Sequence, residues 1–341
     1  MKTPMPNALK KTSAARSRHG VFVSVLVALL SVLAPGSASA QAAWPTKPLK
    51  IIVPFPPGGT TDNLARLLAQ KLSEAYKQNV LVENRAGAAG VIGSDVVAKS
   101  APDGYTLLLS SLASQVIAPV IQKTPYDGLR DFTHIAILGG PPTAIAVGPG
   151  LPDIKDLQSF IALAKAKPNS VGYATPGNGT HGHVIAELFK QLSGAQIAHV
   201  PYKGSGPAFA DLVAGHVPAA SLTISALVPQ MRTGKIRALA STSAKRLADF
   251  PDVPTFAELG YPGMTAITWF GIAGPAKMPA EVTESLNREI RKAMQAADVR
   301  ERLQAETFEI PDYNVTQAGD YVRSETARWQ PVARASSAKN D

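Results

Sequence analysis

A strand, a stiff loop and a helix follow one another between residues 49 and 72. Residues 49–53 read Leu-Lys-Ile-Ile-Val, the composition of a buried strand. Residues 54–59 read Pro-Phe-Pro-Pro-Gly-Gly, in which the prolines fix φ and the glycines allow close approach to the backbone. From Leu64 onward, apolar residues recur at the spacing of one helix face. A helix start carries unpaired N–H groups and partial positive charge, so this loop can hold an anion without a cationic side chain.

The same loop could instead be no more than a connection between a strand and a helix. It does not fit the phosphate-binding patterns, because it lacks G-x-x-x-x-G-K-[ST] and no G-x-G-x-x-G opens this helix. Spacing alone therefore leaves a ligand loop and a plain turn as open alternatives.

The first forty residues have the pattern of a secretory signal peptide. Five Lys or Arg and no acidic residue precede an apolar run at 21–34. That run is about fourteen residues long, and a membrane span needs about 20, which argues against the alternative of an uncleaved anchor. Residues 38–40 read Ala-Ser-Ala, so we expect cleavage after Ala40 and export to the periplasm. No later segment is apolar enough to suggest a span.

Composition excludes several classes of protein. The chain contains no cysteine, which excludes disulfides, a thiolate nucleophile and a lipidated N-terminal cysteine. The formal charge of +9 counts 34 basic residues, of which five lie in the leader, leaving 29 against 25 acidic residues. This small surplus has no clustered runs and does not favour nucleic acid as a partner. An aromatic content of 6% argues against a sugar site of stacked rings.

Strands and helices alternate along both halves of the chain. Two apolar runs are separated by Gly-Gly-Pro-Pro at residues 139–142, and a second series starts near Pro152. That series again places a Pro/Gly loop, residues 175–183, between a strand and a helix. The alternation predicts an α/β fold of parallel sheets covered by helices, with ligands at the strand ends. Two such units facing each other would form a cleft lined by helix N-termini.

The expected domain organisation follows from these breaks. After a signal peptide at residues 1–40, the first domain takes residues 41–143 and the second takes residues 144–267. The chain then returns to the first domain with residues 268–332 and C-terminal helices. Residues 333–341 are expected to be a disordered tail.

Five segments carry a resemblance to a known family. They are residues 53–59 with Asp62, Ala65 and Arg66; 82–87 with Gly90, Ile92 and Gly93; 102–107; 200–204; and 251–255 with Glu258. In order and spacing they resemble the Bug/TctC-type receptors, the periplasmic solute-binding proteins associated with tripartite tricarboxylate transporters. The resemblance covers residues 44–329. It implies a two-domain type II periplasmic-binding-protein fold with a central ligand cleft, which closes by hinge motion around a small organic acid.

The resemblance also implies where the acid binds. Backbone amides, hydroxyls and waters of two loops would hold a carboxylate, one loop being the Pro-Gly-Gly loop and the other lying at 177–183. The candidate ligand-binding residues are Phe55, Pro57, Gly58, Gly59, Thr60, Ser111, Asn178, Gly179, Thr180, His183, Lys203 and Gly204. Most of these come from the motif match, whereas Ser111 lies at a strand end and Lys203 and Gly204 lie in another loop that leads into a helix.

Four charged or titratable residues have competing interpretations. We expect Asp62 to stabilise the helix start and to pair with Arg66 four residues later, rather than to bind a ligand. His181 and His183 would point about 200° apart on a helix, and no third ligand accompanies them, so we expect no metal site. His183 is expected to brace its loop. Lys203 could attract an anion or brace a turn, and both interpretations stay open.

Two further positions bear on the ligand. Trp269 and Phe270 open an apolar run and are expected in the core. Many receptors of the resembled family carry an Asp at or near the positions of Pro218 and Leu222, and its absence here argues against an amino-acid ligand.

The function expected from these observations is capture of a small organic carboxylate for a tripartite tricarboxylate-type transporter. The alternative is a sensory receptor that docks, when liganded, on a membrane kinase. A hydrolase is less supported, because no G-x-S-x-G occurs and no acid pair can be recognised. We expect no cofactor, no metal, no nucleic acid and a monomer whose membrane partner is a transporter subunit or kinase. The sequence does not identify the acid.

Overall fold

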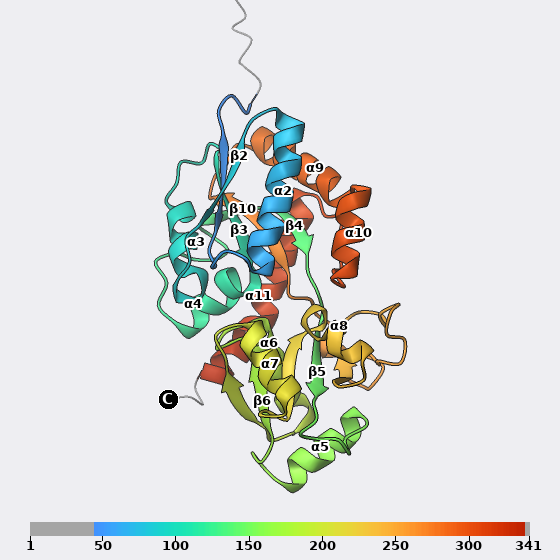
Figure 1. The fold of residues 1–341 in the computed structure, drawn as a ribbon. Coiled ribbons are helices and arrows are strands. Elements are labelled where there is room, and N and C mark those ends of the chain that lie inside the picture. Colours follow the sequence, from blue (N-terminus) through green and yellow to red (C-terminus); the bar gives the residue numbers. More distant parts are fainter. Residues whose placement is uncertain (1–43, 338–341) are drawn as a thin grey trace, which may run out of the picture. The chain divides into compact units, whose positions relative to one another are not determined.

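The computed structural model describes residues 44–337 (Figure 1). The predicted leader, its cleavage after Ala40 and the last four residues of the predicted tail lie outside the described residues. The described part contains two five-stranded sheets and the helices that cover them. Within that part, no helix combines the length and the apolar character needed to cross a bilayer.

The first sheet has the strand order β2-β1-β3-β10-β4. Its strands are β1 (Leu49–Val53), β2 (Val80–Asn84), β3 (Thr106–Ser111), β4 (Phe132–Gly139) and β10 (Phe270–Pro275). β1 runs parallel to β2 and β3, whereas β10 is antiparallel to both β3 and β4. The second sheet repeats this plan with the order β7-β6-β8-β5-β9. Its strands are β5 (Thr143–Val147), β6 (Gly172–Thr175), β7 (Ala198–Pro201), β8 (Ala219–Thr223) and β9 (Arg237–Ser241).

The expectation of parallel sheets is therefore only partly right, because each sheet contains one antiparallel strand. β6 is parallel to β7 and β8, but β5 is antiparallel to β8 and β9. A parallel connection requires a crossover helix, and no described α-helix separates β4 from β5 or β9 from β10. Each of these connections instead carries the chain into the other sheet. We name residues 140–142 the first crossing and residues 265–269 the second crossing. The predicted domain boundaries, after residues 143 and 267, stay a proposal.

Helices cover both faces of each sheet (Figure 1). The helices are α2 (Thr60–Tyr76), α3 (Val91–Ala98), α4 (Ala118–Ile121), α5 (Leu157–Ala166), α6 (His181–Ser193), α7 (Ser205–Ala214), α8 (Ile224–Arg232), α9 (Ala280–Gln295), α10 (Ala297–Ala305) and α11 (Val315–Ser337). In the first sheet, α2 and α9 share one core with β1, and α3 packs on the opposite face. In the second sheet, α7 and α8 cover one face, and α5 and α6 cover the other.

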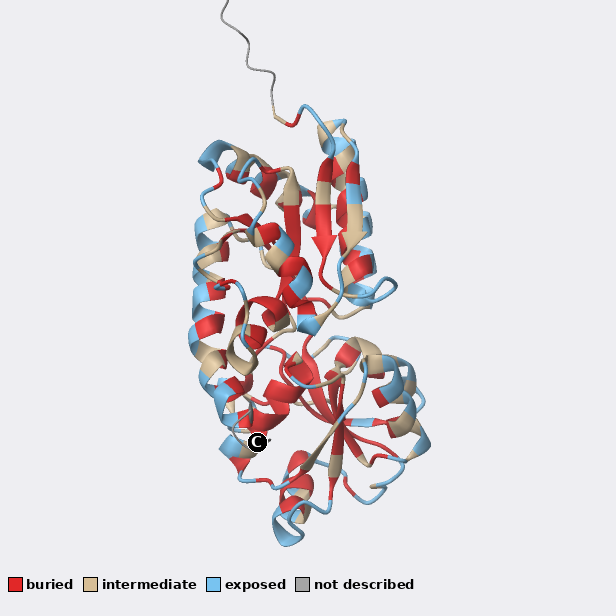
Figure 2. Ribbon diagram, turned by 90° about the vertical axis from the view of Figure 1, so that its left-hand side faces the viewer, coloured by how far each residue is buried: buried red, intermediate tan, exposed pale blue. Residues whose placement is uncertain are grey.

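Helix α9 buries apolar residues that recur every four positions, namely Leu286, Ile290 and Met294. Figure 2 shows buried residues concentrated in the strands and on one side of each large helix. Helix α11 packs on β4 of the first sheet and on α6 of the second, and its Trp329 is fully buried. This helix continues to Ser337, beyond residue 332, where we expected order to end.

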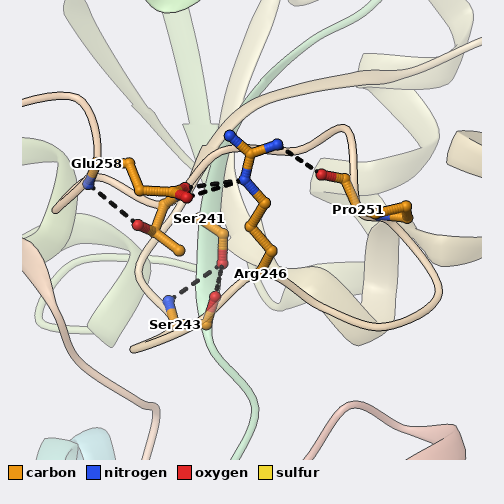
Figure 3. A network of polar contacts seen from close by, with 6 residues as sticks. Ser241, Ser243, Arg246, Pro251 and Glu258 are labelled. Atoms are coloured by element: carbon orange, nitrogen blue, oxygen red, sulfur yellow. Dashed lines mark hydrogen bonds and ion pairs between the residues drawn. The ribbon is translucent and has the colours of Figure 1, made fainter.

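A network of polar contacts fixes the long connection between β9 and the second crossing (Figure 3). The Nε of Arg246 donates to both carboxylate oxygens of Glu258 at 3.0 Å, and its guanidinium also donates to the Pro251 carbonyl at 2.7 Å. Glu258 accepts the N–H of Thr255 at 2.8 Å and returns its own N–H to the Thr255 hydroxyl at 3.1 Å. This reciprocal pair has the form of a capping box and explains the spacing of the Pro-Asp-Val-Pro-Thr motif and Glu258.

Candidate functional site

A cleft with a volume of about 710 Å³ lies among loops that leave both sheets. Nine of the twelve residues predicted from the sequence line it, namely Phe55, Pro57, Gly58, Gly59, Thr60, Ser111, Thr180, Lys203 and Gly204. They come from the loop after β1, the end of β3, the loop after β6 and the loop after β7. The loops at carboxyl ends of parallel strands thus converge on one cavity, as expected for an open α/β sheet. Their role in binding stays a prediction.

Four helix N-termini among the described residues border the cleft. The N-cap residues of α2, α6, α7 and α8 are Gly59, Thr180, Gly204 and Thr223, and all four line the cavity. The first intrahelical bond of α2 is donated by Asn63 to the Gly59 carbonyl at 3.0 Å, so the N–H groups before Asn63 have no partner within the helix. Helix dipoles and unpaired donors therefore point positive charge toward the same cavity.

The charged side chains around the cleft favour an anion. Among the described residues that line it, none is acidic and Lys203 is the only Lys or Arg. The Lys203 side chain is exposed and makes no hydrogen bond or ion pair with the described residues. No contact therefore supports the alternative that Lys203 braces a turn. Attraction of an anion by its charge requires no contact with other residues of the chain.

Asp62 locks the first loop and corrects one expectation. Its carboxylate accepts the Nε–H of Arg66 and the N–H of Gly58, both at 3.0 Å, and the amide of Asn84 at 2.9 Å. The hydrogen bond from Arg66, the largest cause, lowers the pKa of Asp62 to about 2. The predicted pair with Arg66 is confirmed. The N–H of Gly58, expected to be free for a ligand, is taken by Asp62, which leaves the N–H groups of Gly59, Thr60 and Thr61 as candidate donors of this loop.

The two glycines of the first loop differ in their backbone. Gly58 has φ +84, a conformation that L side chains rarely adopt. Gly59 has φ −84 and ψ 173, which any residue adopts, and a Cβ there would meet no atom within 4 Å. Gly58 is thus required by the turn, whereas Gly59 lines the cleft and has an ordinary backbone conformation with open space where a Cβ would lie.

Three predicted residues do not line the cleft but shape its second loop. Asn178 is exposed at the tip, and Gly179 packs so tightly that an added Cβ would collide with Ile121. The Gly179 N–H donates to Nδ1 of His183 at 3.2 Å, and the His183 N–H donates to the Thr180 hydroxyl at 3.4 Å. The expectation that His183 braces this loop is confirmed.

A stack of aromatic rings that includes His183 supports the same loop. The rings of His183 and His199 lie 4.2 Å apart and nearly parallel, and Tyr173 stacks on His199 at 5.1 Å. Nε2 of His199 lies 2.6 Å from the hydroxyl of Thr175, whose oxygen accepts the N–H of Gly177 at 3.2 Å. Burial lowers the pKa of both histidines, that of His199 to about 4, so both are neutral near pH 7.

Sequence reasoning missed one wall of the cleft. Thr268, Trp269 and Phe270 line it, as does Leu222 at the end of β8. Trp269 and Phe270 are buried, as expected, with 0% and 8% of their surface exposed. Because β10 is antiparallel, Phe270 lies opposite Ser111, so the beginning of β10 shares an edge with the end of β3. An expectation of parallel strands would place the beginning of β10 at the opposite end of the sheet, away from the end of β3.

The predicted second loop, residues 177–183, also contains two residues that the list of candidates omits although a signal for them was present. Residues 177–182 read Gly-Asn-Gly-Thr-His-Gly, follow β6 and open α6, which is the G-x-G-x-x-G spacing. The third glycine of that pattern serves close packing of helix on strand. Gly182 does so here, since a Cβ would collide with the Ser221 carbonyl. The pattern favours His181 and Gly182 as candidates, and both line the cleft.

Comparison with known proteins gives a consistent result. The model of the tripartite tricarboxylate transporter family receptor matches residues 64–337. Protein BugT of Bordetella pertussis is 40% identical over 319 residues, which are 93% of this chain and 97% of BugT.

Solved structures extend the likeness to the fold. An R. palustris protein solved with adipate is 35% identical with a TM-score of 0.76, over 85% of this chain and 97% of that one. MatC from Rhodopseudomonas palustris, solved with bound malate, is 31% identical with a TM-score of 0.74, over 85% of this chain and 100% of that one.

Proposed function

Because this chain belongs to the tripartite tricarboxylate transporter receptor family, we propose that it captures a small organic carboxylate in the cleft and presents it to transporter subunits in the membrane. Members of this family are periplasmic solute-binding proteins, not enzymes, and have the two-domain type II fold that the sequence predicted. Export through the predicted signal peptide would place the protein in the periplasm. The identity of the acid and of the membrane partner belongs to the proposal.

The convergence of four helix N-termini on a cavity that has no acidic lining residue in the described part of the chain carries this proposal. A carboxylate there would accept N–H donors of Thr60 and Thr61 on one side and of the start of α6 on the other. Lys203 adds a positive charge at the rim. The relatives solved with adipate and malate support a carboxylic acid as the ligand class.

The rest of the cleft would receive the carbon skeleton of the acid. Phe55, Leu112, Leu222, Trp269 and Phe270 give it apolar walls. Among the described residues, no acidic side chain lines the cleft to pair with an ammonium group. This agrees with the argument from Leu222 against an amino-acid ligand. We expect closure about the two crossings to bury the ligand, as in other hinged binding proteins.

Thermal unfolding against a panel of organic acids tests the proposal. The protein is first unfolded and refolded to remove any acid carried through purification. Adipate, malate, monocarboxylates and the corresponding amides are then added at matched concentrations. A ligand that binds only the folded state stabilises it by about 2.7 kcal/mol at a hundredfold excess over Kd. A shift with an acid and none with its amide supports the proposal, whereas no shift with any acid argues against it.

The acid found in this way separates a transporter from a sensor. Deleting the gene should abolish uptake of that acid if the protein serves a transporter. Normal uptake in the deletion strain, together with loss of an acid-dependent transcriptional response, would favour a sensor kinase as the partner.

A further inference from the structure

His181 connects the second loop of the cleft to both crossings. It is the first residue of α6, is 4% exposed and lines the cleft. Its Nδ1 lies 2.6 Å from the hydroxyl of Thr268 in the second crossing and 3.0 Å from the hydroxyl of Thr143, where the first crossing enters β5. The two hydroxyl oxygens are 3.5 Å apart. One ring nitrogen thus contacts two segments that are 125 residues apart in the chain.

The crossings are themselves bonded to each other. The Thr268 N–H donates to the Pro141 carbonyl at 2.9 Å, and Pro142 forms an antiparallel bridge with Ile267. A displacement of either crossing therefore reaches the Thr268 hydroxyl and, through it, the ring of His181.

The environment of His181 keeps its ring neutral and leaves Nδ1 as the ring nitrogen that forms hydrogen bonds. Burial, with a smaller contribution from the nearby Arg328, lowers the pKa of His181 to about 3. Nε2 has no hydrogen-bond partner among the described residues, and the ring meets Trp329 in a T-shaped contact with 5.7 Å between centroids. A neutral imidazole with its proton on Nε2 has one acceptor, Nδ1, and both threonine hydroxyls can donate to it. The shorter distance makes Thr268 the main partner.

We propose that His181 is a positioning residue that couples the ligand loop to the hinge through its hydrogen bond with Thr268. This inference rests on the proposed function. Thr180, Gly182, Thr268 and Trp269 line the same cleft, so an occupant would contact both ends of this link. The helix end that holds the ligand and the crossing that bends on closure then move as one unit, and binding is transmitted to the hinge.

Hydrogen exchange of backbone amides in the full chain without ligand tests the link. Thr268→Val removes the hydroxyl at nearly constant shape, and His181→Phe keeps a ring against Trp329 but removes both nitrogens. We expect Thr268→Val to accelerate exchange in residues 181–185 by about fivefold, the factor for one lost buried hydrogen bond. His181→Phe should do the same in residues 266–270. The double variant should be no faster than the single variants, because both remove one interaction.

Thr283→Val is the matched control. The Thr283 hydroxyl is buried and donates to the Pro279 carbonyl at 3.0 Å within α9, so its loss should change exchange only in that helix. The proposal is overturned if each variant accelerates only its own segment, or if the double variant shows the sum of two independent effects.

A second arm uses the acid that gives the largest thermal shift in the panel. Small-angle X-ray scattering should show the ligand-induced compaction of the wild-type protein to be reduced in Thr268→Val and unchanged in Thr283→Val. A protein that responds to no acid would count against the proposed function and leave the exchange result standing. Full compaction in Thr268→Val, with acid bound as in the wild type, would overturn the coupling alone.

Discussion

Residues of the first loop have different roles: one glycine is needed to form the turn, and the other lines the cleft. Gly58 adopts φ +84 and gives its N–H to Asp62, whereas Gly59 has an ordinary φ and open space where a Cβ would lie. A side chain at Gly58 would cost roughly 1–2 kcal/mol because the left-handed conformation is strained for L residues. A side chain at Gly59 would cost the fold little and would project into the space that a ligand needs.

Gly59→Val is therefore expected to abolish binding while preserving the fold. Affinity for the acid identified in the thermal panel should fall by more than about tenfold, because the branched side chain prevents close approach to the helix N-terminus. Calorimetric titration measures the affinity, and the unfolding midpoint without ligand should stay near the wild-type value. Gly263→Val is the control, since a Cβ there also meets no atom within 4 Å and the residue lies outside the cleft. Binding by Gly59→Val at wild-type affinity would remove this loop from the site.

Lys203 should act on the ligand through charge alone. Lys203→Gln is expected to lower affinity about fivefold at low salt, the factor for about 1 kcal/mol of solvent-screened attraction. The difference from the wild type should shrink as salt is added. Lys167→Gln removes another exposed charge, which lies outside the cleft, and should leave affinity unchanged. A Lys203→Gln defect that persists in high salt would indicate a direct contact instead of a screened field.

At the scale of the elements, the start of α6 depends on the histidine pair that supports its first turn. The stacked pair of His183 and His199 holds the loop before α6, and Tyr173, Glu187 and Lys190 surround that pair. Protonation of His183 would convert Nδ1 from an acceptor to a donor, which cannot hold the Gly179 N–H. Acid should therefore loosen this end of the helix before the rest of the sheet.

The stability of the protein should fall as the pH drops from 6.5 toward 4. Burial lowers the pKa of His199 from 6.5 to about 4, so the unfolded chain binds more protons than the folded one in this range. His199→Phe keeps the stack on His183 and removes one titrating group. The slope of unfolding free energy against pH, from denaturant titrations, should therefore be smaller in the variant by up to about 1.4 kcal/mol per pH unit. Parallel slopes for variant and wild type would show that His199 does not titrate in this way.

The sequence predicted the elements better than their arrangement. β1 matches its predicted range, residues 49–53, because apolar composition and flanking turn residues are local signals. The antiparallel direction of β5 and β10 depends on pairing between distant segments, which no local pattern encodes. Trp269 and Thr268 were missed as cleft residues for that reason. The partner of the Gly58 N–H was missed because it depends on the side chain of Asp62, not on the loop pattern.

In the molecule as a whole, the two sheets are joined where three backbone segments lie in contact and form hydrogen bonds with one another. Gly140 exchanges both backbone hydrogen bonds with Glu309, at 3.0 and 3.1 Å, and the neighbouring Pro141 carbonyl accepts the N–H of Thr268. A Cβ on Gly140 would collide with the Thr268 carbonyl and lie 3.2 Å from the Cα of Trp269. The absence of a side chain here is what allows the crossings to approach.

Gly140→Ala should consequently affect both stability and closure. Gly140 does not have a positive φ, so the effect is steric and should cost about 1–3 kcal/mol, as overpacking typically does. Because the added methyl group separates the crossings on which closure depends, scattering should also show a smaller ligand-induced compaction than in the wild type. Gly263→Ala, which meets open space, should change neither quantity. If Gly140→Ala lost stability but closed fully around the ligand, the crossings would be a structural joint and the bending would have to occur in another segment, such as the turn before α11.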